Sequence, residues 1–264
     1  MLAALADRYG PPDILRLAEM PDPVPGPGEV AVRVLAAGVT RGDARMLSLE
    51  VPPGFGPMLR LLLGLRRPRR PVRGSEFVGI VRAPGAGGLV PGTRVMGLMG
   101  LRGGAQAEAL TIAAGGLVLP APGSLSDAEA AGFFFGGLTA ADFLIDKAAV
   151  RTGERLLVNG ATGAVGSAAL QIARHLGART TAVCSAANAP LARDLGAEAA
   201  IDYAAGPIGG TWDVILDVAG TLPWPVARPL LAPGGRLVPV TQGLGAMLGA
   251  ALRPRRDGRR ITAG

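Results

Sequence analysis

The clearest change in the spacing of apolar residues lies between residues 151 and 176. An unbroken apolar run, Leu156 to Val158, ends at Asn159-Gly160, and a loop of small residues follows. Beyond the loop, apolar residues recur at the spacing of one helix face, at Val165, Ala169, Ile172, Ala173 and Leu176. The pattern therefore predicts a buried strand, a tight loop and a helix.

Two helix patterns precede this unit, and strand and helix patterns alternate after it. Ser126 and Glu129 form a capping-box pattern at the start of the first of two predicted helices, which cover residues 125–133 and 138–150. Further strands are predicted at residues 179–185, 199–203, 212–220 and 236–241, with a sixth at 259–264 and a helix over 189–197. Alternation of this kind predicts right-handed βαβ units and a doubly wound parallel sheet.

Residues 1 to about 120 show a different pattern, with short strands separated by Gly and Pro. Val30–Leu35 alternates apolar and polar positions, and residues 74–81, 91–98 and 103–112 complete the pattern of a small β-rich barrel. Residues 36–47 read as a polar loop that runs into a short helix. The Pro- and Arg-rich stretch Val51–Arg73 is expected to be a loop or flap.

Three glycines in the central loop, Gly160, Gly163 and Gly166, form the pattern G-x-x-G-x-x-G between the strand and the helix. Such glycines allow a sharp turn, close approach of a pyrophosphate and close packing of helix on strand, and the helix N-terminus then faces the phosphates. No Lys-Ser/Thr pair follows, so a P-loop fits less well. In a chain with 41 glycines the strand–loop–helix context carries this prediction, since a lone triplet could arise by chance.

The residues after the second strand of the parallel sheet favour NADPH over NADH. An NAD site places Asp or Glu there, on the ribose hydroxyls. This chain has Ser185, followed by Ala186, Ala187 and Asn188, and the Ser185 hydroxyl can donate to a 2′-phosphate.

The composition of the chain argues against several other kinds of partner and site. The net charge is +7, but the excess sits largely in Arg60–Arg73 and Arg253–Arg260, so neither nucleic acid nor a membrane is expected as a main partner. One Cys and one His cannot supply a protein zinc site. The lone cysteine fits a reducing cytoplasm, the N-terminus lacks a signal peptide pattern, and the apolar runs are too short to span a bilayer.

Few other polar residues are candidates for chemistry. Thr40 and Asp43 are the best substrate-side candidates, and a solvated turn with Asp43 as a helix cap is the alternative. His175 reads as a residue at a helix C-terminus, and Cys184 as packing. Tyr203 ends a strand, where cofactor contact and plain packing are equally compatible. Asp217 is expected to make loop or cap hydrogen bonds. No catalytic residue is assigned.

Nearly the whole chain resembles the medium-chain dehydrogenase/reductase superfamily, and within it the zinc-independent quinone oxidoreductase-like branch. The segments that carry the resemblance include YGPPDILRL, AAGVTRGDARM, GLRRPRRPVRGSEFVGIV, PGTRVMGL, GAQAEAL, LTAADFL, VNGATGAVGSAALQIARHLGA, VCSAANAPLARDLGAEAAIDY and WDVILDVAG. The resemblance implies a GroES-like β-barrel domain over 1–122 and a Rossmann domain with a doubly wound parallel sheet over 123–264. A dimer is common in the superfamily, so a homodimer is one expected assembly.

The resemblance also implies which residues line the cofactor. They are Thr139, Asn159, Gly160, Ala161, Thr162, Gly163, Ala164, Val165, Gly166, Ser185, Asn188, Tyr203, Val218, Ala219, Gly220, Val240 and Thr241. The zinc-dependent members carry a Cys near Val39-Thr40 and a His where Ser75 stands, which agrees with the absence of a metal. Related quinone reductases often have Asn at the Thr40 position.

The expected function is a zinc-independent, NADPH-dependent transfer of hydride to a quinone, enone or related carbonyl acceptor. Family members continue past the sixth strand with a segment that returns to the barrel, and we expect this segment to be missing here. A non-catalytic NADPH-binding sensor or scaffold, or a truncated inactive family member, is therefore the alternative. Nucleic-acid association through the arginines is a weaker one.

Overall fold

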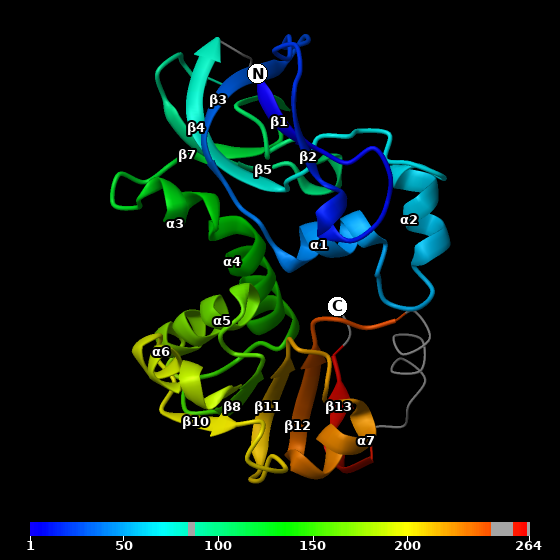
Figure 1. The fold of residues 1–264 in the computed structure, drawn as a ribbon. Coiled ribbons are helices and arrows are strands. Elements are labelled where there is room, and N and C mark those ends of the chain that lie inside the picture. The colour runs from blue at the N-terminus through cyan, green and yellow to red at the C-terminus, as the bar shows by residue number, and fades with distance from the viewer. Residues whose placement is uncertain (84–87, 244–255, 263–264) are drawn as a thin grey trace. The chain divides into compact units, whose positions relative to one another are not determined.

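The computed structural model describes residues 1–83, 88–243 and 256–262, and the chain divides into two compact units (Figure 1). The first comprises Met1–Val51 and Phe55–Phe135, and the second Pro52–Gly54 and Gly136–Gly264. The domain boundary at 122/123 stays a prediction.

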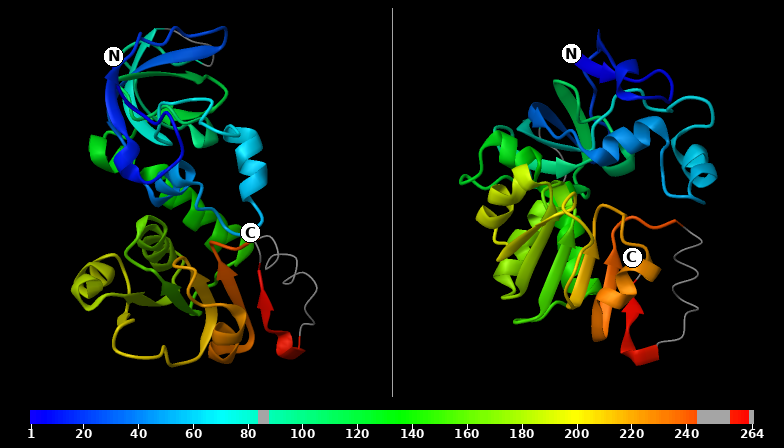
Figure 2. Two further views of the ribbon diagram at one scale, coloured as in Figure 1. Left: turned by 45° about the vertical axis from the view of Figure 1, so that its right-hand side comes forward. Right: turned by 60° about the horizontal axis from the view of Figure 1, so that its bottom comes forward.

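The first unit is built on a five-stranded antiparallel sheet with the order β6-β3-β4-β5-β7. Its strands are β3 (Glu29–Ala37), β4 (Glu76–Ala83), β5 (Arg94–Leu98), β6 (Ala109–Ala113) and β7 (Leu117–Pro120). Alternate residues of β3, Val30 and Val32, are fully buried against Phe77, Val95 and Leu110. The sheet curls around this core (Figure 2), and the predicted small barrel is confirmed.

Outside the sheet, the first unit contains a further pair of strands and a helix that the sequence did not locate. A hairpin of β1 (Leu2–Leu5) and β2 (Arg16–Glu19) precedes the barrel. The segment 51–73, predicted as a loop or flap, contains the helix α2 (Gly56–Leu63), which the sequence pattern did not predict. A run of leucines with Pro at the start of the helix favours helix formation, and the surrounding prolines and arginines hid this signal.

The remaining helices of this region follow the capping signals in the sequence. The short helix α1 (Arg41–Ser48) begins after the polar loop as predicted. The helix α3 (Asp127–Ala131) begins with the predicted capping box, in which the Ser126 hydroxyl and the Glu129 carboxylate satisfy each other's backbone N–H groups. The second predicted helix is α4 (Phe133–Ala141), which continues as the π-helix η3 (Asp142–Lys147). The division between the two units falls within α4.

The second unit contains a six-stranded parallel sheet with the order β10-β9-β8-β11-β12-β13 (Figure 2). Its strands are β8 (Arg155–Asn159), β9 (Arg179–Cys184), β10 (Ala199–Asp202), β11 (Trp212–Asp217), β12 (Leu231–Pro239) and β13 (Arg260–Ile261). The helices α5 (Ala164–His175), α6 (Ala189–Asp194) and α7 (Trp224–Ala227) connect successive strands and pack on the sheet. This order is that of a doubly wound sheet, as predicted, with the change of direction between β8 and β11.

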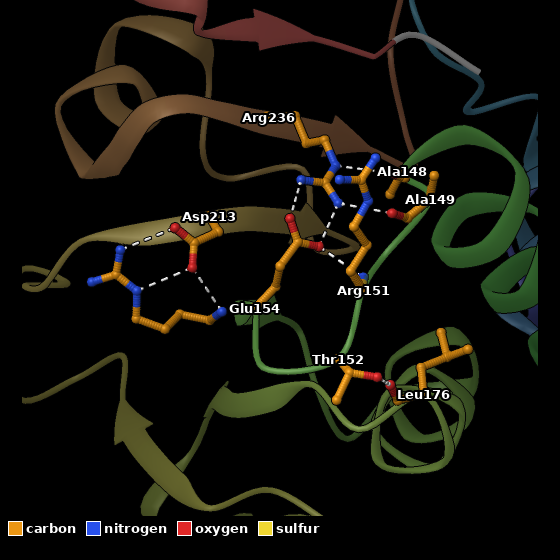
Figure 3. Close-up of polar contacts among 9 residues, drawn as sticks. Ala148, Ala149, Arg151, Thr152, Glu154, Leu176, Asp213 and Arg236 are labelled. Atoms are coloured by element: carbon orange, nitrogen blue, oxygen red, sulfur yellow. Dashed lines mark hydrogen bonds and ion pairs between the residues drawn. The ribbon is translucent and has the colours of Figure 1, made fainter.

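A polar network ties together the amino ends of the strands (Figure 3). The buried Arg236 side chain on β12 donates to both carboxylate oxygens of Glu154, at 2.8 and 2.7 Å, and to the carbonyl oxygens of Ala148 and Ala149. The Arg236 guanidinium holds the pKa of the Glu154 carboxyl below its usual value. This bidentate pair lies at the end of the sheet opposite the glycine loop.

Among the described residues, no helix is long and apolar enough to cross a bilayer. Residues 253–255 of the second arginine group, and most of the apolar run 243–252, lie outside the described residues.

Candidate functional site

The glycine loop closes the carboxyl end of β8 with a sharp turn. Gly160 has a φ of +80°, a conformation that favours glycine, and the N–H groups of Gly160 and Ala161 both donate to the Val183 carbonyl at 3.1 Å. The loop is thereby fixed to the neighbouring strand β9 before α5 begins at Ala164. The predicted turn at the first glycine of the fingerprint is confirmed.

The N-terminus of α5 is left uncapped by side chains. Its N-cap residue is Gly163, which has no side chain to accept from the first-turn N–H groups. A Cβ placed on Gly163 would meet only the Gly160 carbonyl oxygen, at 3.7 Å, so there is space in front of the helix. Unpaired N–H groups and the positive end of the helix dipole together suit a phosphate or pyrophosphate.

Two close backbone contacts hold this helix end in place. A Cβ on Gly166 would lie 2.7 Å from the Ala161 Cα atom and would collide with the Gly160 carbonyl oxygen. A Cβ on Gly136 of α4 would lie 2.9 Å from the Ala164 carbonyl carbon. Gly166 was expected to pack closely, whereas the contact of Gly136 with Ala164 was missed. Thr139, half-buried, lies one helical turn beyond Gly136, on the same side of α4.

A buried hydrogen-bond cluster connects the ends of β8 and β11. The Asn159 side chain donates to Asp217 Oδ1 at 2.7 Å and to Thr221 Oγ1 at 2.8 Å. Asp217 also accepts from the N–H groups of Gly220, at 2.9 Å, and Leu222, at 2.9 Å. The expectation that Asp217 makes loop hydrogen bonds is confirmed. The Asn159 side chain acts here by shaping the loop after β11.

The loops after β11 and β12 form a second wall at this edge. The Val240 N–H donates to the Asp217 carbonyl at 2.9 Å, and Gly220, with a φ of +75°, lies so close to Thr241 that a Cβ would be 2.8 Å from its hydroxyl. Val218 and Ala219 donate to the Asn159 carbonyl. A cavity of about 240 Å³ lies here, lined among others by Asp217, Gly220 and Thr241. The predicted residues of these two loops are therefore neighbours.

A third group gathers at the carboxyl end of β9. The Asn188 amide donates to the Thr162 hydroxyl at 3.2 Å, which joins the glycine loop to the turn that begins at Ser185. Tyr203 is 64% exposed, and its N–H donates to the Cys184 carbonyl at 3.3 Å. The structure thus brings Thr162, Ser185, Asn188 and Tyr203 to one edge of the sheet.

Cys184 and His175 take structural positions. Burial raises the pKa of the Cys184 thiol, and the nearby Asp202 carboxylate raises it further, so the thiol stays protonated at neutral pH. His175 is the last residue of α5, where its charged form would interact favourably with the helix dipole. Neither residue joins a cluster of potential metal ligands within the described ranges.

In the first unit, Thr40 and Asp43 satisfy each other in a capping box at the start of α1. The Thr40 hydroxyl accepts from the Asp43 N–H at 3.1 Å, and Asp43 Oδ2 accepts from the N–H and hydroxyl of Thr40. The alternative expectation was a helix cap at Asp43. The Asp43 side chain does take part in the cap, as the N3 residue, while Thr40 is the N-cap residue. A substrate role for the pair stays a prediction.

Next to this cap lies a buried carboxyl that sequence reasoning missed. Glu76 is 2% exposed and accepts from the Phe135 N–H at 2.9 Å. Burial raises its pKa above the usual value, and the backbone hydrogen bond opposes that rise. The neighbouring Ser75 Oγ and Arg73 Nε are buried without a hydrogen-bond partner in the part of the chain that the structure describes. An acidic residue beside the apolar run FVGIV was the available signal.

The residues present do not fit a zinc ion. Zinc sites in proteins are built mainly from Cys and His, and the chain has one of each, on β9 and at the end of α5. No group of three or more His, Cys, Asp or Glu side chains comes together among the described residues.

Comparison with known proteins gives consistent matches. A family model described as "Alcohol dehydrogenase GroES-like domain" matches residues 26–123, and one described as "Zinc-binding dehydrogenase" matches residues 164–250. The chain is 29% identical over 254 residues to the chloroplastic quinone-oxidoreductase QR1 of Triphysaria versicolor, covering 90% of this chain and 74% of that protein. It is 34% identical over 187 residues to a trans-enoyl reductase of Aspergillus terreus, covering 67% and 49%. Among solved structures, the quinone oxidoreductase of Thermus thermophilus, also determined as an NADPH complex, superposes with a TM-score of 0.74 at 34% identity, covering 100% of this chain and 80% of that one.

Proposed function

Because this chain belongs to the medium-chain dehydrogenase/reductase superfamily of NAD(P)H-dependent oxidoreductases, we propose that it uses NADPH, without zinc, to reduce a quinone, enone or related carbonyl. The observation that carries the proposal is the uncapped N-terminus of α5, with Gly163 opening space in front of it and Gly166 packed against the loop. Bound NADPH supplies the hydride. The protein binds the cofactor, orients it and excludes water.

Within this proposal the backbone of Gly160–Gly166 holds the pyrophosphate. The loops that end in Gly220 and Thr241 form a wall beside it, and Thr139 approaches from α4. All residues predicted from the resemblance belong to these loops, to α4 or to the edge at β9. In this proposal residues 1–122 form the substrate domain and residues 123–264 form the cofactor domain.

The preference for NADPH is proposed from the edge at β9. Ser185 and Asn188 offer neutral donors where an NAD site would carry a carboxylate. One carboxylate, Asp202, ends the neighbouring strand β10 and accepts from the Ala204 N–H at 3.0 Å. Since no Lys or Arg occurs at positions 185–188, the expected preference is moderate.

For the acceptor, the names of the relatives point to quinones and enones. A binding protein without turnover is the second candidate, because Thr40 and Asp43 already satisfy each other in the capping box. The two candidates share the cofactor site and differ in whether NADPH is consumed.

The experiment combines a fluorescence titration with NADPH and a consumption assay over a panel of quinones and enones. Wild-type protein should bind NADPH, and Gly166→Ala should bind about tenfold more weakly or worse, because the added methyl group displaces the loop that holds the pyrophosphate. Gly209→Ala is the matched control, since a Cβ there meets nothing within 4 Å. Binding without consumption would favour the second candidate. No binding of either nicotinamide cofactor would refute both.

A further inference from the structure

The helix α2 presents an apolar face to solvent. Met58, Leu61 and Leu62 follow the i, i+3, i+4 spacing of a single helix face, and they are 51%, 62% and 52% exposed. Leu59, the next residue after Met58, is buried. Leu65 extends the exposed apolar surface just beyond the end of the helix. We refer to Met58, Leu61, Leu62 and Leu65 as the α2 apolar face.

The segment that contains this face is rich in arginine and carries no acidic residue to neutralise the charge. Between Glu50 and Glu76 the chain contains six arginines and no Asp or Glu. Arg66 and Arg70 are exposed, and their side chains make no hydrogen bond or ion pair to the residues that the structure describes. Arg66 directly follows Leu65 in the chain, and Arg70 lies four residues further on, so both unpaired charges belong to the segment that carries the α2 apolar face.

The segment is held in a defined conformation. The Arg60 guanidinium donates to the Leu65 carbonyl at 3.0 Å and lies over the Tyr9 ring, while the Tyr9 hydroxyl donates to the Gly64 carbonyl at 2.8 Å. Gly64 ends the helix with a φ of +130°, which favours glycine. The exposed leucines and arginines are thus presented by a braced helix and turn, so little ordering is required on binding.

We propose that this surface docks on an anionic phospholipid bilayer. An exposed apolar helix face flanked by arginines is the pattern of a helix that lies in the membrane interface, with leucines at the acyl boundary and arginines at the phosphates. A nucleic acid would engage the arginines but leave the leucines in water. An acidic protein with apolar side chains could contact both the arginines and the leucines, but no feature of the segment favours such a protein over a bilayer.

This docking surface changes the expectation of no membrane partner. That expectation rested on the short apolar runs and on the location of the positive charge, whereas a helix lying on the surface needs no spanning segment. The exposure of Met58, Leu61 and Leu62 could only be seen in the structure. The proposal does not depend on the cofactor or on turnover.

The test is sedimentation of the full chain with vesicles of phosphatidylcholine alone or mixed with phosphatidylserine, at low and high salt. We expect binding to the mixed vesicles that weakens with salt. Arg66→Gln with Arg70→Gln should weaken it about 25-fold, since each basic residue contributes about fivefold near such a surface. Leu61→Ser with Leu62→Ser should weaken it about tenfold or more.

The control is Arg33→Gln with Arg151→Gln, which removes two exposed arginines outside the segment and should leave vesicle binding unchanged. If the control and Arg66→Gln with Arg70→Gln lost the same amount of vesicle binding, the binding would depend on total charge, and the proposed docking surface would be refuted. Three further results would also overturn the proposal: no vesicle binding, tight binding of single-stranded RNA that survives the leucine substitutions, or a dimer that the leucine substitutions dissociate. All altered side chains are exposed, and unchanged circular dichroism would verify folding.

Discussion

Replacing Arg236 by Met should destabilise the second unit strongly while leaving the first unit intact. The substitution preserves most of the side-chain volume but removes four hydrogen bonds, two to Glu154 and one each to the Ala148 and Ala149 carbonyls. Breaking a buried ion pair by removing one partner costs about 3–5 kcal/mol. Because the Glu154 side chain is 22% exposed, water can partly replace the arginine, and we expect about 3 kcal/mol.

Urea denaturation followed by tryptophan fluorescence measures this loss in the right unit, since both tryptophans, Trp212 and Trp224, belong to it. With a slope of about 2 kcal/mol per M, the midpoint should fall by about 1.5 M. Arg179→Met is the matched control, because its pair with Glu198 is 66% and 55% exposed at 3.4 Å. An exposed ion pair contributes about 0–1 kcal/mol to stability, so the urea midpoint of Arg179→Met should change little.

The pH dependence has a definite sign. Arg236 lowers the pKa of Glu154 in the folded protein, so the pair stabilises the fold above the unfolded-state pKa of about 4.3 and loses this contribution as the pH falls through the folded pKa. The difference between wild type and Arg236→Met should therefore be largest near neutral pH and shrink below about pH 4. A midpoint equal to that of Arg179→Met, or a difference that grows in acid, would refute this reasoning.

Four further substitutions test the site. Ser185→Asp should lower the affinity for NADPH relative to NADH about tenfold, because a carboxylate repels the 2′-phosphate, and titration of both cofactors measures this ratio. Gly136→Ala should weaken NADPH binding, because its Cβ would meet the Ala164 carbonyl carbon at 2.9 Å and displace the start of α5. Unchanged binding would mean that α4 moves and α5 keeps its position. Thr40→Ala should cost about 1 kcal/mol of stability through loss of the cap, measured by thermal denaturation. Ser75→Ala should leave stability unchanged or slightly raised, because the hydroxyl it removes is buried without a partner among the described residues, and a loss above that of Thr40→Ala would contradict this.

The parts of the site that the sequence predicted are made of consecutive residues. The turn at Gly160, the helix from Ala164 and the capping box at Ser126 each depend on neighbours within one or two turns of chain. The doubly wound parallel sheet was also predicted, because alternating strands and helices restrict the chain to a few topologies. Local spacing was sufficient for these features.

The contacts whose partners the sequence did not identify join residues far apart in the chain. Gly136 meets Ala164, and Asp217 accepts from Asn159, 58 residues away. In both cases a small or polar residue is required by a partner whose position only the folded chain defines. The helix α2 was missed for a different reason, because prolines and arginines surround its short run of leucines.

Within its described residues, the first unit contains paired polar side chains at the start of α1 and unpaired polar atoms at the start of β4. Thr40 and Asp43 were selected from the sequence as substrate contacts because they are polar, yet each is already satisfied by the other. A buried donor without a partner loses free energy until a ligand oxygen or water reaches it, whereas a paired donor gains little from a new acceptor. In the described part of this unit the buried unpaired groups include Ser75 Oγ and Arg73 Nε, beside the buried carboxyl of Glu76. The start of β4 therefore differs from the start of α1, because Ser75 Oγ and Arg73 Nε have no partner among the described residues, whereas Thr40 and Asp43 satisfy each other.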